Sequence, residues 1–330
     1  MKNLKSVLIA INFIFLALSS AAQDTLVYSS AAGIHARGMM LYKNKLIVGT
    51  NTGAIFSIKN GKSKEIHAAS KHKEIRDITA TNKGWMAMSS GDSSALLFFK
   101  RNRLKQIESS LFNGIFLDGI DSKGDVVFIM GDPNQKGDLS LYYSTDGGKS
   151  IQLVPNRVHA KKEEAAFAAS GTTVFVEDEN KWFFVTGGGS SRLIQTQDGG
   201  QNWSIHTLPY PRCSSCGPYS ISKINDSSFV CVGGDYQNEA VGKTSCFWSN
   251  DGGKTWQEPV QTVGGYRSCI LRVNQTLYVC GTTGLDFSRD KGKTWESIAQ
   301  GNFLSMVSDG EKLYVSASKG RIITFQLKEP

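Results

Sequence analysis

The sequence has few prolines and no recognisable linker between domains. Only 7 of its 330 residues are proline, and no segment rich in proline, or in glycine and serine, divides the chain. No helical period is sustained, because short alternating apolar runs separated by Gly, Asn and Asp fill the chain instead. These absences exclude a helical protein and favour one domain, although 330 residues would suffice for two.

One apolar run exists, and it lies at the N-terminus. It covers 12 residues, Val7 to Leu18, which is too short to span a bilayer. Lys2 and Lys5 precede it, and a small-residue cleavage site ending at Ala22 follows. We expect residues 1–22 to be a signal peptide and residues 23–330 to be a single domain exported to the periplasm or the extracellular space. No lipid anchor and no membrane-spanning segment is expected.

The chain carries no concentrated charge of either sign. Lysine and arginine number 37 against 29 aspartates and glutamates, and loss of Lys2 and Lys5 with the signal would leave 35. The basic residues do not form runs, so we interpret them as solvated surface charge and expect no nucleic-acid partner. We expect a monomer.

Patterns for metals and dinucleotides are also missing. The five histidines show neither the HxxxH nor the HxH spacing, so no metal site is expected. Gly187-Gly188-Gly189 lacks the last glycine of the GxGxxG pattern, because Arg192 stands in its place, and no strand–helix context surrounds it. We therefore expect no cofactor.

What the sequence does contain is four copies of the pattern Ser/Thr-x-Asp-x-Gly-x-x-Trp. They occupy residues 144–151, 196–203, 249–256 and 288–295, with Ile151 in place of tryptophan in the first copy. We expect the hydroxyl and the carboxylate to bind backbone N–H groups of a tight turn, and the tryptophan to bury its ring beneath it. The structural residues of these Asp-boxes are Asp146, Asp198, Asp251, Asp290, Trp203, Trp256 and Trp295.

The spacing of the copies predicts the fold. They start 52, 53 and 39 residues apart, which is the length of a four-stranded propeller blade. The chain divides into seven units, near residues 33–67, 74–108, 112–155, 163–209, 217–260, 266–299 and 302–327. The last unit has three strands, and Thr25–Ser29 is a strand with no blade of its own. We expect an all-β, seven-bladed β-propeller with four-stranded antiparallel blades, closed by this N-terminal strand, because closure removes open sheet edges.

Two cysteine pairs suggest disulfides across strands. Cys269 and Cys280 flank an expected hairpin turn at Asn274-Gln275 and should face each other. Cys231 and Cys246 could pair in the same way across another hairpin. Export would permit both bonds.

The remaining cysteines form a CxxC, Cys213-Ser-Ser-Cys216. Such a motif serves redox or metal chemistry in some proteins. No second CxxC and no βαβ pattern accompany it here, which favours a structural loop disulfide or a pair of bystander thiols.

Alignment of the blades places Arg37, Arg76 and Arg267 at equivalent positions near the start of the innermost strands. Because inner strands lie closest to the axis, we expect these side chains to converge on one mouth of the channel and to bind an anionic group. In the alternative, each arginine pairs with a carboxylate of a neighbouring blade and only stabilises the ring. The other candidate residues of this axial face are Asp77, Asp132, Glu164, Arg192, Tyr219, Asp235, Tyr236 and Tyr266.

Several short phrases point to a family. They are Arg37-Gly38, Ile75-Arg-Asp-Ile78, Gly131-Asp-Pro133, Glu164-Ala-Ala-Phe-Ala-Ala-Ser-Gly171, Thr186-Gly-Gly-Gly189 with Arg192, Gly233-Gly-Asp-Tyr236 and Gly265-Tyr-Arg-Ser268. In them the chain resembles the bacterial propellers with BNR/Asp-box repeats that are related to the photosystem II stability/assembly factor, within the sialidase-like superfamily. The resemblance implies a seven-bladed propeller that binds a protein or peptide and has no established catalysis. Partner identity does not transfer, since nothing in the chain indicates a photosynthetic host.

A sialidase-like glycoside hydrolase acting on an anionic sugar is the alternative function. It shares the Asp-boxes, the export signal and the size. Its chemistry would assign roles to Arg37, Arg76 and Arg267 as carboxylate holders, Tyr266 or Tyr219 as nucleophile, Glu164 as its helper and Asp77 as acid/base. Sialidases are six-bladed, and the Phe/Tyr-Arg-Ile-Pro phrase expected near their N-terminus is missing. We therefore favour a non-catalytic binding protein.

Overall fold

A computed structural model describes residues 22–28, 31, 33–69, 74–91, 94–101, 103–107 and 110–327. Residues 1–21, and with them nearly all of the expected signal peptide, lie outside the described part. The described residues form strands, with one short 3-10 helix, η1 (Ser110–Phe112). No helix among them is long and apolar enough to cross a membrane.

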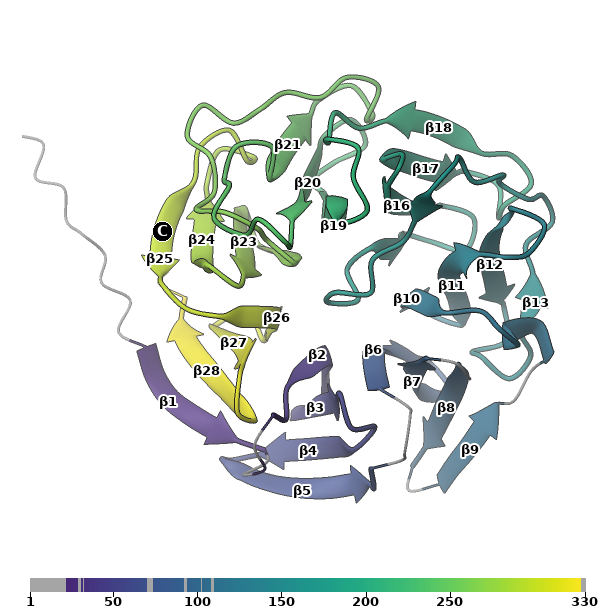
Figure 1. The fold of residues 1–330 in the computed structure, drawn as a ribbon. Coiled ribbons are helices and arrows are strands. Elements are labelled where there is room, and N and C mark those ends of the chain that lie inside the picture. The colour runs from purple at the N-terminus through teal and green to yellow at the C-terminus, as the bar shows by residue number, and fades with distance from the viewer. Residues whose placement is uncertain are drawn as a thin grey trace, which may run out of the picture.

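Seven antiparallel sheets stand around a common axis, as the sequence predicted (Figure 1). The first blade contains β2 (Ala36–Tyr42), β3 (Lys45–Thr50), β4 (Ile55–Lys59) and β5 (Lys62–His67). The second contains β6 (Glu74–Thr81), β7 (Gly84–Ser90), β8 (Ala95–Lys100) and β9 (Arg103–Ile107). The third contains β10 (Leu117–Lys123), β11 (Val126–Pro133), β12 (Leu139–Ser144) and β13 (Gln152–Leu153).

The later blades continue around the ring. The fourth has β14 (Glu164–Ala165), β15 (Val174–Val176), β16 (Trp182–Gly188), β17 (Arg192–Thr196) and β18 (Ser204–Thr207). The fifth has β19 (Cys216–Lys223), β20 (Phe229–Asp235) and β21 (Cys246–Ser249). The sixth has β22 (Cys269–Val273), β23 (Thr276–Gly281), β24 (Gly284–Ser288) and β25 (Glu296–Ala299). The seventh has β26 (Phe303–Ser308), β27 (Lys312–Ala317) and β28 (Arg321–Gln326), to which β1 (Ala22–Val27) adds the outer strand.

Two blades depart from the regular pattern of four strands. In the fifth blade, the fourth position is held by an isolated bridge between Trp248 and Gln257 rather than by a strand. In the fourth blade, the inner strand is split, because β14 and β15 both pair with β16 but are separated by residues 166–173. We call these eight residues the axial segment.

The ring closes as expected from the unpaired N-terminal strand. β1 pairs antiparallel with β28, with Leu26 opposite Ile322 and Val27 opposite Arg321. The first and last strands of the described part, β1 and β28, therefore lie in one blade, at the left of Figure 1. Pairing β1 with β28 covers the edge that a three-stranded last blade would expose.

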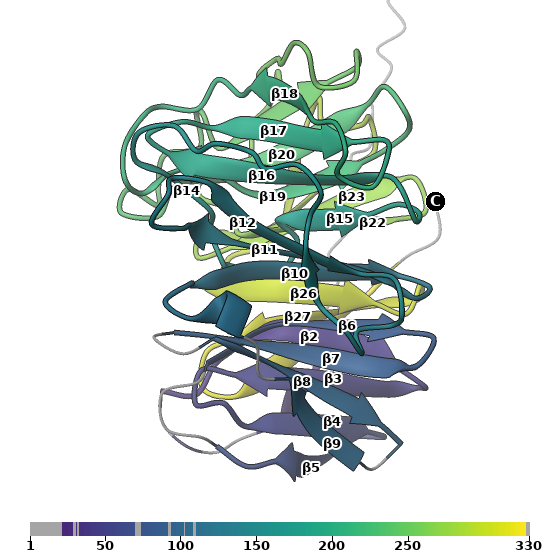
Figure 2. The ribbon, with the colours of Figure 1, turned by 90° about the vertical axis from the view of Figure 1, so that its right-hand side faces the viewer.

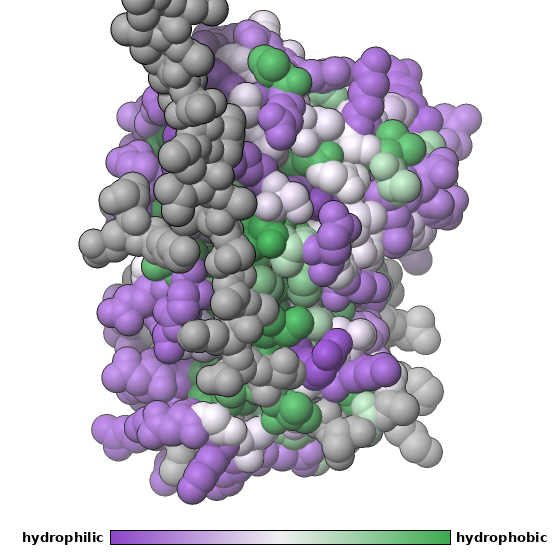
Figure 3. Space-filling view, turned by 90° about the vertical axis from the view of Figure 1, so that its left-hand side faces the viewer, coloured by the Kyte–Doolittle hydropathy of each residue, from purple (hydrophilic) through white to green (hydrophobic). Residues whose placement is uncertain are grey.

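The hydrophobic core lies between neighbouring blades. Figure 2 shows the sheets packed face to face, so a middle strand such as β7 is buried on both sides along its whole length. Outer strands have one free edge and carry charge, as in Lys62-Ser-Lys-Glu of β5. The described residues visible on the rim in Figure 3 are mostly hydrophilic, with apolar side chains in small separate groups.

The Asp-box turns carry the hydrogen bonds that their sequence suggests. In the third copy, the Ser249 hydroxyl donates to Asp251 at 2.8 Å and accepts from the N–H of Gly253 at 3.0 Å. The Thr255 hydroxyl and N–H both donate to Asp251 and hold the pKa of its carboxyl at about 2. The indole N–H of Trp256 donates to the carbonyl of Gly253 at 2.9 Å. These turns lie away from the axis and fix the blade architecture.

The expected cross-strand disulfides are not formed. Cys231 and Cys246 are free thiols on opposite faces of their blade, because Cys246 pairs in register with Val232 rather than with Cys231. Cys269 does lie opposite Cys280, flanking the expected turn, but both are free and buried. The sulfur of Cys269 lies 3.9 Å from the Thr172 hydroxyl and takes hydrogen bonds instead of a covalent partner.

Candidate functional site

The inner strands share a bulge near their start. The pairing register shifts at Arg37, Arg76, Asp118, Tyr219 and Leu304, in five different blades. A bulge inserts one extra residue and re-aims its side chain. All five side chains line the same cavity on the axis. One recurrent backbone irregularity therefore builds the candidate site.

This axial pocket has a volume of about 510 Å³. It contains two arginines, three carboxylates and a group of aromatic rings around the axial segment. The residues that line it are Arg37, Arg76, Phe116, Asp118, Asp132, Ala166, Phe167, Ala168, Ala169, Tyr219, Tyr236, Glu239, Tyr266, Ser268, Thr282 and Leu304. Its size suits a few amino-acid side chains of a ligand.

Arg37 and Arg76 lie side by side and share one carboxylate. Nη2 of Arg76 is 2.7 Å from a Glu74 oxygen, and Nε of Arg37 is 3.8 Å from the other. About a quarter of each arginine side chain stays exposed. Nε of each guanidinium has no hydrogen-bond partner among the described residues. Two cations with one counter-ion leave this side of the pocket able to accept an anion.

Both arginines also bind the axial segment. Nη1 of Arg76 donates to the carbonyl of Ala168 at 2.9 Å, and Nη1 of Arg37 donates to that of Ala169 at 3.1 Å. The arginines therefore stabilise the axial segment as well as line the pocket. This agrees in part with the alternative in which the arginines stabilise the ring.

The wall next to Arg76, formed by the third blade, is acidic. Asp118 is buried, and burial, followed by the nearby Asp132, raises the pKa of its carboxyl well above the usual range, while Arg76 opposes this shift. Burial also raises the pKa of Asp132, whose Oδ1 accepts from the N–H of Ala166 at 3.3 Å. The site thus places two guanidiniums next to two carboxyls whose pKa is raised by burial.

Aromatic rings form the third wall. Phe167 and Tyr219 stack with their centroids 4.2 Å apart, and Tyr266 meets Tyr219 edge to face at 4.9 Å. The hydroxyl of Tyr219 donates to the carbonyl of Ser215 at 2.8 Å, which fixes the ring. Tyr236 is the most exposed ring of the group, with 47% of its surface open. These faces can hold an apolar side chain beside the arginines.

The axial segment crosses the channel and contacts every other blade. Beyond Arg37, Arg76 and Asp132, its Ser170 hydroxyl donates to the carbonyl of Ser268 at 2.7 Å. The N–H of Ile221 donates to Thr172 at 3.1 Å, and Ser305 donates to Ser170 at 3.5 Å. In Figure 1, where β14 and β15 carry no label, a teal loop beside β16 reaches toward the centre of the ring. A second cavity, of about 430 Å³, lies where Gly171 and Thr172 meet later residues of the inner strands.

Arg267 does not join the other two arginines. It is 1% exposed, and its Nε and Nη2 donate to one oxygen of Asp286 at 2.8 and 2.6 Å. Ser268, one residue later, occupies the pocket instead. A shift of one residue in a strand moves a side chain to the other face, so the sequence alignment was out of register here.

Other predicted site residues are structural as well. Glu164 and Arg192 form a buried pair with 2.6 Å between Oε1 and Nε, and Thr186 also donates to Glu164. Asp77 is buried and accepts from the N–H groups of Ile78 and Ile120, each at 2.8 Å. These three side chains hold the axial segment and the inner strands in place.

Of the proposed axial face, the pocket brings together Arg37, Arg76, Asp132, Tyr219, Tyr236 and Tyr266. Asp235 instead lies beside the Cys213–Cys216 disulfide. Asp118 was not predicted from the sequence, because the third unit was expected to begin near residue 112, ahead of the inner strand that begins at Leu117. The phrase Leu117-Asp-Gly-Ile120, parallel to Ile75-Arg-Asp-Ile78, was the available signal.

The residues nominated for glycoside hydrolysis are not assembled into one site. Arg267, Glu164 and Asp77 are buried in contacts of their own, away from the pocket that holds Arg37 and Arg76. A third arginine for a substrate carboxylate is therefore not present in this cavity, as far as the described residues show.

Comparisons with known proteins agree with the fold. The family model of the BNR/Asp-box repeat matches residues 247–258, which include the whole of the third Asp-box. Curated proteins gave no match to the sequence. Among solved structures, YCF48 bound to D1 peptide is 13% identical with a TM-score of 0.64, over 92% of this chain and 97% of that one. YCF48 from Cyanidioschyzon merolae is 12% identical with a TM-score of 0.63, over 93% and 99% of the two chains.

A third similar structure belongs to an enzyme. A catalytically inactive virginiamycin B lyase from Staphylococcus aureus with quinupristin is 15% identical, with a TM-score of 0.66 over 92% of this chain and 99% of that one. At these identities the likeness is one of fold, and the same ring serves a peptide-binding protein and a lyase. The function of this chain has to be argued from its own pocket.

Proposed function

We propose that this protein is exported and binds a peptide segment of a partner protein in its axial pocket, through Arg37 and Arg76. The observation that carries the proposal is the pair of adjacent guanidiniums that share Glu74 at the edge of an open aromatic cavity. Guanidinium binds carboxylate through two parallel hydrogen bonds, so an acidic side chain or a C-terminal carboxylate is the group expected there.

The aromatic wall supports a peptide over a simple anion. Tyr219, Tyr266 and Phe167 present ring surface next to the arginines, where an apolar side chain adjoining the carboxylate would pack. YCF48 has this fold and is known bound to D1 peptide, which makes peptide binding at such a ring a precedent. We also propose that the chain belongs to the bacterial assembly-factor-like propellers that its motifs resemble.

The binding proposal is tested with a random peptide library that displays free C-terminal carboxylates. Peptides selected by the wild-type protein are measured again with Arg76→Ala and Arg37→Ala. Loss of charge-assisted hydrogen bonds should weaken binding at least about tenfold. Arg157→Ala is the matched control, because that arginine is exposed and pairs with Asp138 outside the pocket.

Two results would refute the role of the arginines. One is unchanged affinity of both pocket variants for the selected peptides. The other is loss of the thermal transition in both, which would make the arginines structural only. Amidated copies of the peptides separate a C-terminal carboxylate from an acidic side chain as the bound group.

Export has an independent test. The protein recovered from outside the cytoplasm should begin at Gln23, as found by N-terminal sequencing. Recovery of the full-length chain from the cytoplasm alone would contradict this part of the proposal and leave the binding test unaffected.

A further inference from the structure

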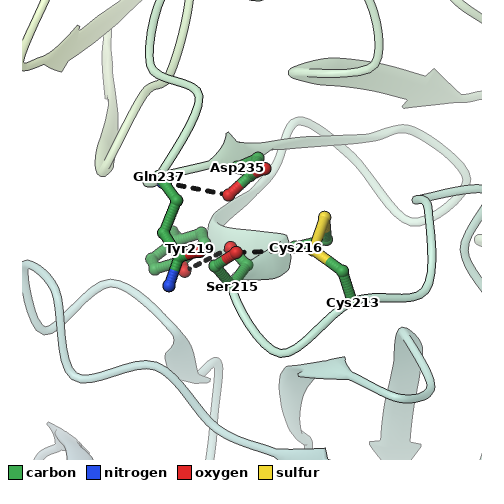
Figure 4. The surroundings of a disulfide bond; sticks show 6 residues. All are labelled: Cys213, Ser215, Cys216, Tyr219, Asp235 and Gln237. Carbon is green, nitrogen blue, oxygen red and sulfur yellow. Dashed lines mark hydrogen bonds between the residues drawn. A yellow bond between two sulfur atoms is a disulfide. The ribbon is translucent and has the colours of Figure 1, made fainter.

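The Cys213–Cys216 disulfide lies beside a carboxylate that the peptide pocket does not use. Cys216 begins β19 and pairs in register with Asp235, the last residue of β20, so their side chains share one face of the sheet. The two sulfurs and a carboxylate oxygen of Asp235 all lie within 4.8 Å of one another (Figure 4). In the described part of the chain, no other three histidine, cysteine or acidic side chains gather in this way.

These residue types and this spacing are those of a metal site. Two cysteines separated by two residues bind zinc from a single turn in many structural sites, and carboxylate oxygens are also zinc ligands. In the structure the sulfurs are bonded to each other, so neither is a thiolate. We propose that reduction of this disulfide opens a site for Zn²⁺ or a similar divalent cation, held by Cys213, Cys216 and Asp235.

The chemistry balances with a dithiol or a phosphine as reductant. Two electrons and two protons convert the disulfide into two thiols, while a dithiol becomes a disulfide or a phosphine becomes its oxide with oxygen from water. The cation then displaces both thiol protons into solvent and is bound by two thiolates and the carboxylate. A fourth position stays open to water, as in zinc sites with three protein ligands.

Hydrogen bonds from neighbouring groups orient the three proposed ligands. The N–H of Gln237 donates to Oδ1 of Asp235 at 2.9 Å, which orients the carboxylate. The Ser215 hydroxyl lies 3.4 Å from the sulfur of Cys213, where it can donate to a thiolate. The N–H of Cys216 donates to the carbonyl of Cys213 at 3.2 Å and would keep the turn closed after the S–S bond breaks. Cys213 is only partly buried, which gives the cation a path from solvent.

The experiment compares oxidised and reduced protein. The purified chain is reduced with a phosphine, and Zn²⁺ is titrated against a chromogenic chelator. We expect one tightly bound Zn²⁺ per reduced chain and none per oxidised chain. Co²⁺ in place of Zn²⁺ should give the near-ultraviolet charge-transfer absorption of thiolate ligands. Circular dichroism before and after reduction checks that the fold persists.

Three variants separate the ligands from other thiols and acids. The double variant Cys213→Ser/Cys216→Ser keeps the four buried thiols and should not bind Zn²⁺. Asp235→Asn should bind at least about tenfold more weakly, since loss of even an outer partner commonly costs that much. Asp226→Asn is its control, because Asp226 is an exposed carboxylate that pairs with Lys223.

Clear outcomes would overturn the proposal. These are equal binding by oxidised and reduced protein, binding by the double serine variant, unfolding of the chain on reduction, or equal affinity of the two asparagine variants. Any of them would show that the three side chains do not form a cation site.

Discussion

Single residues of the same type have different roles in this protein, and their register in the strand decides which. Arg37 and Arg76 stand at bulges and line the pocket, whereas Arg267 stands one position earlier and forms a buried ion pair with Asp286. Removal of one partner from a buried pair leaves an uncompensated charge. Arg267 is therefore a poor probe of binding, because its loss would destabilise the fold.

The buried carboxyl of Asp118 should make the stability of the protein depend on pH. Burial raises the pKa of its carboxyl well above the unfolded value, so the folded state binds more protons and stability falls as the pH rises above about 4. Asp118→Asn removes the ionisable group. Its melting temperature should exceed that of the wild type at pH 7, by an amount equivalent to at least about 1 kcal/mol, and the difference should vanish near pH 4.

Calorimetry across this pH range checks the prediction. Asp178→Asn is the control, because hydrogen bonds from Asn180 and Lys181 outweigh slight burial and lower the pKa of Asp178, so its loss should not stabilise the chain. A less stable Asp118→Asn at pH 7 would mean instead that the charged carboxylate stabilises the fold through Arg76.

Residue-level prediction from sequence succeeded where the pattern was local. The Asp-box serine, aspartate and glycine lie within five positions, so their hydrogen bonds follow from the motif. The roles of Arg267 and Asp118 depend on where each bulge falls. A bulge has no strong residue signature, and one position of error exchanges a pocket residue for a core residue.

At the scale of elements, the axial segment interrupts the inner strand of its own blade and contacts every other blade. Its phrase, Ala166-Phe-Ala-Ala-Ser-Gly-Thr-Thr173, looks like a strand in sequence, yet it leaves the fourth blade and crosses the channel. The partners that hold it are far away in sequence, such as Arg37, 132 positions from Ala169. No local pattern predicts contacts of that kind, which is why the segment was not foreseen.

Gly171, in the axial segment, has no room for a side chain. Its φ of +79° is unfavourable for other residues, and an added Cβ would lie 2.1 Å from Oδ1 of Asp77. Asp77 cannot move freely, because it accepts the N–H groups of Ile78 and Ile120. Gly171→Ala should therefore destabilise the protein by more than about 1–3 kcal/mol, as measured by urea unfolding.

Gly61→Ala is the matched control. Gly61 has a similar φ of +72°, but an added Cβ would meet nothing within 4 Å. The difference between the two variants measures the contact with Asp77, separate from the backbone strain they share. If both variants lose the same free energy of unfolding, the axial segment can shift away from Asp77 without a loss of stability.

At the scale of the whole molecule, sequence reasoning was most reliable. Repeat length alone indicated seven blades, because each Asp-box marks one blade and the remaining chain divides at the same period. Closure by the N-terminal strand could be predicted because a last blade of three strands would leave an open sheet edge. Global closure is thus easier to predict than the position of one side chain in a bulge.

Because β1 closes the ring, its backbone hydrogen bonds to β28 should contribute to stability. The N–H of Tyr28 donates to the carbonyl of Gly320 at 2.9 Å, and bonded pairs alternate along antiparallel strands. Leu26, opposite Ile322, is therefore a bonded position, whereas Val27, opposite Arg321, points its N–H outward. Leu26→Pro should remove a ladder hydrogen bond and lower the free energy of unfolding by about 2 kcal/mol or more.

Val27→Pro provides the contrast, since proline is tolerated on an edge strand where the N–H faces solvent. It should unfold nearly as the wild type does, and Leu26→Ala should account for the loss of the leucine side chain alone. Urea unfolding of the three variants, with limited proteolysis of the N-terminal strand, separates the effects. If Leu26→Pro and Val27→Pro are equally stable, β1 does not hold the ring closed through its backbone, and the packing of Tyr28 and Leu26 against the first and seventh blades would be its main contribution.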